Sequence, residues 1–152
     1  MNSVLTFQRE PLMPAFQEAG PLFREHYEEI AWKQDKVKLD PDVGKYAAYE
    51  KADVLRVFIA RRDGILVGYA AYILSRPLHY KGIIAATNDV VFLSKSERGG
   101  AGVRLMKFAE KELIAEGVQA ISLHIKTWAN WGKLAERMGY EHTEVIYQKW
   151  VG

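Results

Sequence analysis

The stretch Asp89-Val-Val-Phe-Leu93 is followed by a short polar run and then by Arg98-Gly-Gly-Ala-Gly-Val-Arg104. Its β-branched and aromatic residues predict a strand, and the apolar spacing over residues 103–116 predicts a helix. The glycines between them allow backbone N–H groups to turn towards a ligand. The first turn of a helix also carries unpaired N–H donors and a partial positive charge. The stretch therefore predicts a strand, a loop and a helix that can bind a phosphate-like anion.

Basic side chains surround this loop at Lys95, Arg98, Arg104 and Lys107. Cations at the start of a helix oppose the helix dipole, and an anionic ligand would account for their presence. The alternative is a glycine-rich connection with ordinary surface cations. A Walker loop is excluded because no Gly-Lys-Ser/Thr follows, and the dinucleotide-binding pattern is excluded by the order of elements around the loop.

Working outward, the spacing of apolar residues divides the rest of the chain into strands and helices. Strands are predicted over residues 3–8, 54–60, 65–74, 83–93, 120–125 and 140–150, and helices over 103–116 and 130–138. Residues 11–33 are predicted to form two helices, broken at Pro14 and at Gly20-Pro21. Asp63-Gly64 predicts a hairpin turn, and Asp42 can cap a further short helix that holds Tyr46. The expected order is β-α-α-β-β-β-α-β-α-β, a mixed α/β sheet in one domain spanning residues 1–152.

Composition narrows the class of protein. The 152 residues are 49% hydrophobic and 26% charged with a net charge of +2, which is typical of a folded domain and lacks the dense basic character of a nucleic-acid binder. Neither a signal-peptide start nor an apolar run of the ~18 residues of a membrane span is present, and a cytoplasmic location is expected. The absence of cysteine excludes disulfides, thiolate metal ligands and a cysteine nucleophile. The four histidines show no metal-ligand spacing, so no metal is expected. The sequence leaves a monomer and a homodimer open.

The glycine loop resembles the pyrophosphate signature of the GNAT family of N-acetyltransferases, Arg/Gln-x-x-Gly-x-Gly/Ala after a strand that ends in an aliphatic residue. Leu93 takes the aliphatic place and Arg98 opens the signature, whereas Ala101 replaces the first Gly of the signature and Val103 replaces its last Gly/Ala. Met138-Gly-Tyr140 is similar to the Leu-Gly-Phe element of the family. Together with His26-Tyr-Glu-Glu-Ile-Ala31, these segments look most like a phage-type subgroup.

The resemblance implies the acyl-CoA N-acyltransferase (GNAT) fold and transfer of an acetyl group from acetyl-CoA to a primary amine of unknown identity. The amine is expected to attack the thioester directly in a ternary complex, without a covalent enzyme intermediate. Strand backbone would pair with the pantetheine arm, loop N–H groups would hold the pyrophosphate, and Asn130 would either contact pantetheine or cap a helix. The expected cofactor-binding residues are Val91, Phe92, Leu93, Arg98, Gly99, Gly100, Ala101, Gly102, Val103, Arg104 and Asn130.

Asp89 is the first candidate for the general base, because it lies on the predicted strand beneath the cofactor, nine residues before Arg98, and has the same parity as Val91 and Leu93. The alternative is that Asp89 satisfies the backbone of a bulge or loop. The acid is less evident, since Ala135 stands where the family usually has a tyrosine. Tyr147 is the candidate replacement, although it also suits a core, and the thiolate can instead leave unassisted.

His26, Glu28 and Glu29 are candidates for binding the cationic amine or for acting as the base. The alternative for this acidic cluster is a solvated helix face. His79 is expected either to line the acceptor channel or to be simply exposed. The replacement of the usual tyrosine by Ala135 motivates a second function, a noncatalytic acyl-CoA-binding or regulatory module.

Overall fold

A computed structural model describes residues 2–152 of the chain and contains one five-stranded sheet in the order β1-β2-β3-β4-β5. The first four strands pair in antiparallel fashion, and β5 pairs with β4 in parallel. The predicted mixed α/β sheet is therefore confirmed. The strands are β1 (Leu5–Arg9), β2 (Leu55–Arg62), β3 (Ile65–Ser75), β4 (Ala85–Leu93) and β5 (Ala120–Ser122).

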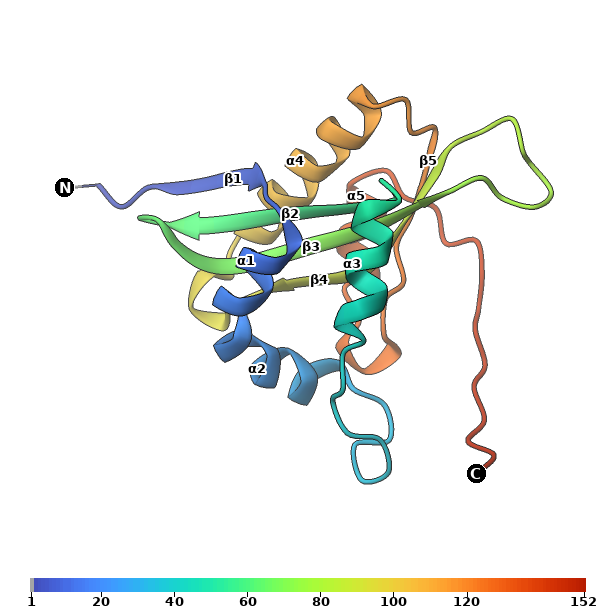
Figure 1. Cartoon of the computed structure of the whole chain (residues 1–152), viewed down its shortest axis with the longest axis horizontal. Helices are drawn as coiled ribbons and strands as arrows, with labels where there is room; N and C mark the ends of the chain where they lie inside the picture. The colour runs from blue at the N-terminus through green and yellow to red at the C-terminus, as the bar shows by residue number, and fades with distance from the viewer. Residues whose placement is uncertain (1) are drawn as a thin grey trace.

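Helices cover both faces of the sheet, with α1, α2 and α3 on one face and α4 on the other (Figure 1). Three helices precede β2, whereas the predicted order counted two; the third is the short helix that Asp42 caps, by accepting a hydrogen bond from Lys45 N at 2.9 Å. The predicted break at Gly20-Pro21 is confirmed, whereas Pro14 lies inside α1. The helices are α1 (Leu12–Glu18), α2 (Gly20–Ile30), α3 (Val43–Lys51), α4 (Ala101–Ala115) and α5 (Gly132–Arg137), with 3-10 turns η1 (Lys95–Glu97) and η2 (Thr127–Ala129).

The hairpin turn predicted at Asp63-Gly64 joins β2 to β3. Both residues have positive φ, 50° and 85°, as a tight hairpin turn requires. Asp63 also accepts hydrogen bonds from Ser3 Oγ and from the N–H of Val4, each at 2.7 Å. The turn therefore also holds the segment that leads into β1.

The final strand predicted over residues 140–150 is wrong. Residues 141–152 are exposed, and within the described chain no hydrogen bond or ion pair involves them. Figure 1 shows this tail leading away from the sheet to the C-terminus. An alternating apolar pattern forms a strand only where an edge pairs with it, and the sheet ends at β5, which has 3 residues. The strand predicted over 120–125 is shortened to β5, because its pairing with β4 ends at Ser122.

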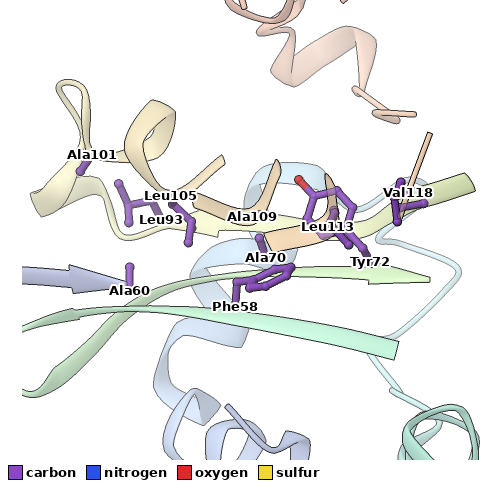
Figure 2. Close-up of a cluster of buried hydrophobic side chains, with 11 residues drawn as sticks. Phe58, Ala60, Ala70, Tyr72, Leu93, Ala101, Leu105, Ala109, Leu113 and Val118 are labelled. Carbon is purple, nitrogen blue, oxygen red and sulfur yellow. The ribbon is translucent and has the colours of Figure 1, made fainter. Parts of the chain in front are cut away.

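Two apolar clusters pack against the sheet, one on each face. On the α4 face, Leu105 and Leu113 meet Phe58 and Tyr72 of the sheet, as Figure 2 shows. On the other face, helices α1 to α3 cover a cluster that includes Ile59. Strand β4 contributes to both clusters, and the segments that follow it are therefore held from both sides. Of the helices described in residues 2–152, none has the length and apolar character of a membrane span.

Gly68 on β3 lies directly against the end of β4. A Cβ at this position would stand 2.5 Å from Leu93 Cδ1 and 2.8 Å from the carbonyl oxygen of Phe92. We therefore expect Gly68→Ala to lower the free energy of unfolding by about 1–3 kcal/mol, since backbone must move to admit the methyl group. Gly82→Ala is the control, because Gly82 has ordinary φ and no atom within 4 Å. Equal stability of the two variants in urea titrations would contradict this packing.

Candidate active site

The site begins where β5 parts from β4. The two strands pair only from Ala85 to Thr87 and from Ala120 to Ser122. Beyond that point the buried side chain of Asn88 accepts a hydrogen bond from His124 N at 2.5 Å, in place of strand pairing. Within residues 2–152, no strand neighbours this edge of β4 from Asp89 to Leu93.

Backbone groups of β4 point into this open edge. Ser94 N donates to Val67 O of β3 at 2.8 Å. Because backbone direction alternates along an antiparallel pair, Val91 and Leu93 direct their N–H and C=O groups away from β3, towards the open edge. These are two of the three residues predicted to pair with pantetheine. The third, Phe92, points its backbone towards β3 and is 3% exposed.

The loop after β4 presents free backbone donors. Gly99 and Gly100 have φ of 119° and 108°, conformations that favour glycine, and Gly100 is the N-cap of α4. In residues 2–152 the N–H groups from Gly99 to Val103 have no protein partner. Gly102 faces open space. A run of unpaired N–H groups at the start of a 15-residue helix fits the predicted pyrophosphate contact.

Arg98 links this loop to α2. Its Nη2 pairs with Glu29 Oε2 at 2.5 Å, its Nε donates to Leu93 O at 3.2 Å, and its guanidinium lies 5.8 Å from the centre of the Phe92 ring. One helical turn before Glu29, Glu25 Oε1 accepts a hydrogen bond from Lys95 N at 3.1 Å. Helix α2 is thus tied to the loop by two carboxylates.

Asp89 is the extra residue of a β-bulge. The pairing of β3 with β4 passes from Ala71–Val90 to Tyr72–Asn88, which leaves Asp89 without a partner. Its exposed carboxylate accepts a hydrogen bond from Tyr46 Oη of α3.

This arrangement corrects the predicted face of Asp89. Leu93 and Val91 pack in the cluster on the α4 face, whereas Tyr46 packs on the face of α1 to α3. The parity argument, which put Asp89 on the face of Val91 and Leu93, is therefore wrong, because the bulge inserts one residue into the alternation. Burial first and the Asp89 carboxylate second raise the pKa of Tyr46 above its usual range, so the phenol stays protonated and donates to Asp89.

A cavity of about 330 Å³ lies on the same face, between helices α1 to α3 and the sheet. Tyr46 and Val90, the two neighbours of Asp89 named above, both line it. The cavity therefore reaches the bulge on the side to which the Asp89 carboxylate is turned.

His26 of α2 also lines this cavity and is 6% exposed. Its Nδ1 shares a 2.7 Å hydrogen bond with Tyr69 Oη, and its ring stacks on Phe92 at 4.7 Å between centroids. Burial lowers the pKa of His26 to about 4, with Arg98 lowering it further and Glu29 opposing the shift. His26 is therefore a neutral wall residue at physiological pH.

The other predicted site residues are not brought together. Glu28 is exposed on α2, and its Oε1 lies 4.0 Å from Arg24 Nε. His79 is exposed in the loop before β4, at the opposite end of that strand from the glycine loop. Tyr147 is 92% exposed in the C-terminal tail. Asn130 Oδ1 accepts a hydrogen bond from Gly132 N at 2.8 Å, just before α5, whose N-cap residue is Trp131.

Sequence reasoning missed Tyr46, and gave no role to Asn88 or His124. Asn88 carried a signal, since asparagine is disfavoured inside a strand and often marks an interruption. Tyr46 carried none, because its contact with Asp89 spans 43 residues of chain. Within residues 2–152, no group of three or more His, Asp or Glu side chains is arranged to hold a metal ion.

Comparison with known proteins bears on both fold and family. The family described as Acetyltransferase (GNAT) family matches residues 16–140. No curated protein matches the sequence significantly.

Several solved structures share the fold. An aminoglycoside acetyltransferase from an uncultured soil metagenomic sample, in complex with sisomicin, has 16% identity and a TM-score of 0.75, with 97% of each chain covered. The ribosomal-protein-alanine N-acetyltransferase of Brucella melitensis biovar Abortus 2308 has 18% identity and a TM-score of 0.73, covering 98% of this chain and 100% of that one. A predicted acetyltransferase with acetyl-CoA from Clostridium acetobutylicum has 12% identity and a TM-score of 0.70, with 96% of each chain covered.

The buried His26 makes a testable contribution to stability. Because its pKa is about 4 in the folded protein and 6.5 is the ordinary value, the unfolded chain binds the extra proton between these pH values. The stabilisation is present above pH 6.5 and is lost as the pH falls towards 4, by up to about 3 kcal/mol. His26→Gln cannot take up this proton, so its free energy of unfolding should fall less over that range in urea titrations. Parallel pH profiles for the two proteins would contradict the prediction.

Proposed function

Because the chain belongs to the acetyltransferase (GNAT) family, we propose that it transfers the acetyl group of acetyl-CoA directly to a primary amine within a ternary complex. The observation that supports this mechanism is the open edge of β4. The glycine loop with its unpaired N–H groups lies at one end of this edge, and Asp89 stands on a bulge at the other. Holding the two reactants together at this edge can lower the barrier by roughly 7–11 kcal/mol.

Acetyl-CoA supplies the activated thioester when bound. Backbone groups of Val91 and Leu93 would pair with the pantetheine arm, and the N–H groups from Gly99 to Val103 would hold the pyrophosphate, whereas the N–H of Arg104 donates to Gly100 O at 3.2 Å. Arg98 is one of the cations at this loop, and a phosphate there would share it with Glu29. The backbone of Phe92 is directed away from the edge, and its ring instead supports His26.

Asp89 is proposed as the general base. The bulge frees its carboxylate from the sheet, and Tyr46 fixes the direction of the carboxylate by donating a hydrogen bond. Asp89 would accept the proton of the amine, directly or through water. General-base catalysis of this kind is typically worth ~10²–10⁴ in rate.

For the leaving thiolate we propose departure without a protein acid. Ala135, at the position of the usual tyrosine, is 5% exposed in α5. Tyr147 remains a candidate only if the exposed tail folds back over the site. The replacement of the usual tyrosine by Ala135 also favours the second candidate function, a noncatalytic acyl-CoA-binding or regulatory module. The two differ in turnover: the module would bind CoA and consume no thioester with any amine.

Of the residues expected at the acceptor, His26 fits a neutral wall position. Glu29 is engaged by Arg98, while Glu28 and His79 lie exposed, and we assign them no contact with the amine. The phage-type subgroup, the cytoplasmic location, a single domain over residues 1–152, and a monomer or homodimer that needs no nucleic acid or membrane remain proposals from the sequence.

Gly102→Val tests the cofactor loop. Gly102 has ordinary φ and no atom within 4 Å, so the fold should tolerate the side chain, while the isopropyl group blocks approach to the N–H groups. We expect at least ~10-fold weaker CoA binding by calorimetry, about 1.4 kcal/mol, with an unchanged melting temperature. Gly82→Val, at another open glycine before β4, is the control and should bind CoA normally. Undiminished binding in Gly102→Val would reject the pyrophosphate assignment.

Asp89→Asn tests the base. We expect kcat to fall by ~10²–10⁴ with little change in CoA affinity, since shape is kept and the proton acceptor is lost. Tyr46→Phe should cause a smaller fall, because the carboxylate stays but loses its orienting hydrogen bond. Thermal stability is measured on the same preparations. A less stable Asp89→Asn protein with near-normal kcat would mean that Asp89 only supports the bulge.

A further inference from the structure

The cavity of about 330 Å³ beside the bulge is walled mainly by apolar side chains. Its size falls in the range of small-molecule sites. Helices α1 and α2 form one wall, and the face of β2, β3 and β4 opposite α4 forms the other. Apolar lining residues from these elements include Phe16, Phe23, Ile30, Ile59, Ala71 and Val90.

The tyrosine hydroxyls and His26 Nδ1 of this cavity are paired within the protein. His26 and Tyr69 share a hydrogen bond, Tyr27 Oη donates to Val37 O at 2.5 Å, and Tyr46 donates to Asp89. His26 is neutral at physiological pH, because burial keeps its pKa low. The inner wall thus offers no free carboxylate to a cation.

Among the described residues that line the cavity, the charged ones lie at its rim. Lys38 and Asp40 are the charged lining residues, and both lie exposed in the loop that leads to α3. Asp89 stands at the bulge, beside the lining residues Tyr46 and Val90. Carboxylates stand only at the mouth, Asp89 at the bulge and Asp40 in the exposed loop, and the walls behind them are apolar, so the cavity can receive an ammonium group at its mouth and an apolar body inside. A second ammonium inside would lose its hydration without gaining a partner.

A second hollow of about 430 Å³ lies on the surface near the end of β1. It is lined by charged residues near the end of β1, including Arg9, Glu10 and Glu50. Each of these is engaged: Arg9 by Glu116 at 2.8 Å, Glu10 by Arg61 at 2.7 Å, and Glu50 by Leu12 N at 2.7 Å. These charges stabilise the fold, and none of the lining residues belongs to the catalytic edge.

We propose that the acceptor is a primary amine carried on a single apolar body, aliphatic or aromatic, which the cavity between α1, α2, α3 and the sheet receives. This inference rests on the proposed acetyl transfer and specifies the substrate class of the same site. It excludes polycationic acceptors, such as polyamines and aminoglycosides, as preferred substrates.

The test compares hexylamine with 1,6-diaminohexane, which has the same chain length and a second ammonium group. With acetyl-CoA, kcat/KM should be at least ~10-fold higher for hexylamine, because only its far end can enter the cavity without desolvating a charge. From propylamine to hexylamine, each added methylene should raise kcat/KM by up to about fourfold, the value for full burial. A preference for 1,6-diaminohexane or spermidine would overturn the substrate class and leave acetyl transfer standing.

A variant moves the preference in a defined direction. Ile30→Glu places a carboxylate in the cavity wall at a half-buried position near the end of α2. It should lower kcat/KM for hexylamine and raise that for 1,6-diaminohexane. Ile114→Glu on α4 is the matched control, since Ile114 is 62% exposed and does not line the cavity. An unchanged ratio in Ile30→Glu, with the protein folded, would contradict the proposal.

Direct binding separates this inference from the proposed function. Both amines are titrated by calorimetry into the wild-type protein saturated with CoA. Tighter binding of hexylamine without turnover of any amine would uphold the cavity assignment and reject catalysis. Equal or weaker binding of hexylamine would reject the cavity assignment whether or not acetyl transfer is observed.

Discussion

The parting of β4 from β5 is the constraint on which the rest of the site depends. One hydrogen bond, from His124 N to the buried Asn88 side chain, stands where the next pair of strand residues would have met. A polar side chain can replace pairing here because it satisfies the N–H that the ladder no longer serves. Continued pairing would have closed the edge, and the backbone of Val91 and the N–H of Leu93 would then have been paired. The end of the β4–β5 pairing thus leaves this edge of β4 open.

The two sides of this edge are held together by charge. Glu25 and Glu29 lie one turn apart on α2, and they contact the N–H of Lys95 and the guanidinium of Arg98. Helix α2 also forms a wall of the apolar cavity. The same helix therefore contacts the glycine loop through its acidic face and lines the cavity through its apolar face. Because the two faces of α2 differ, residues adjacent in sequence contact different parts of the protein: Glu25 contacts the glycine loop and His26 lines the cavity.

Local features were readable from the sequence and long-range ones were not. The Asp63-Gly64 turn, the helix cap at Asp42, the glycine loop and α4 depend on near neighbours, and the structure contains all of them. The face of Asp89 depends on the register between β3 and β4, which no local pattern reveals. The tail after Tyr140 has a strand-like pattern, yet no edge pairs with it. Propensity indicates what a segment can become, and the available partners decide the outcome.

The bulge at Asp89 has a consequence for the comparison of related chains. A bulge is a one-residue insertion, and deleting a single residue between Asn88 and Val91 would restore regular pairing with β3. The Asp89 carboxylate would then no longer point towards α3, although the rest of the sequence would be intact. A length change of one residue in the exposed loop over 76–84 carries no such penalty. An alignment gap in β4 is therefore a stronger sign of altered chemistry than many substitutions elsewhere.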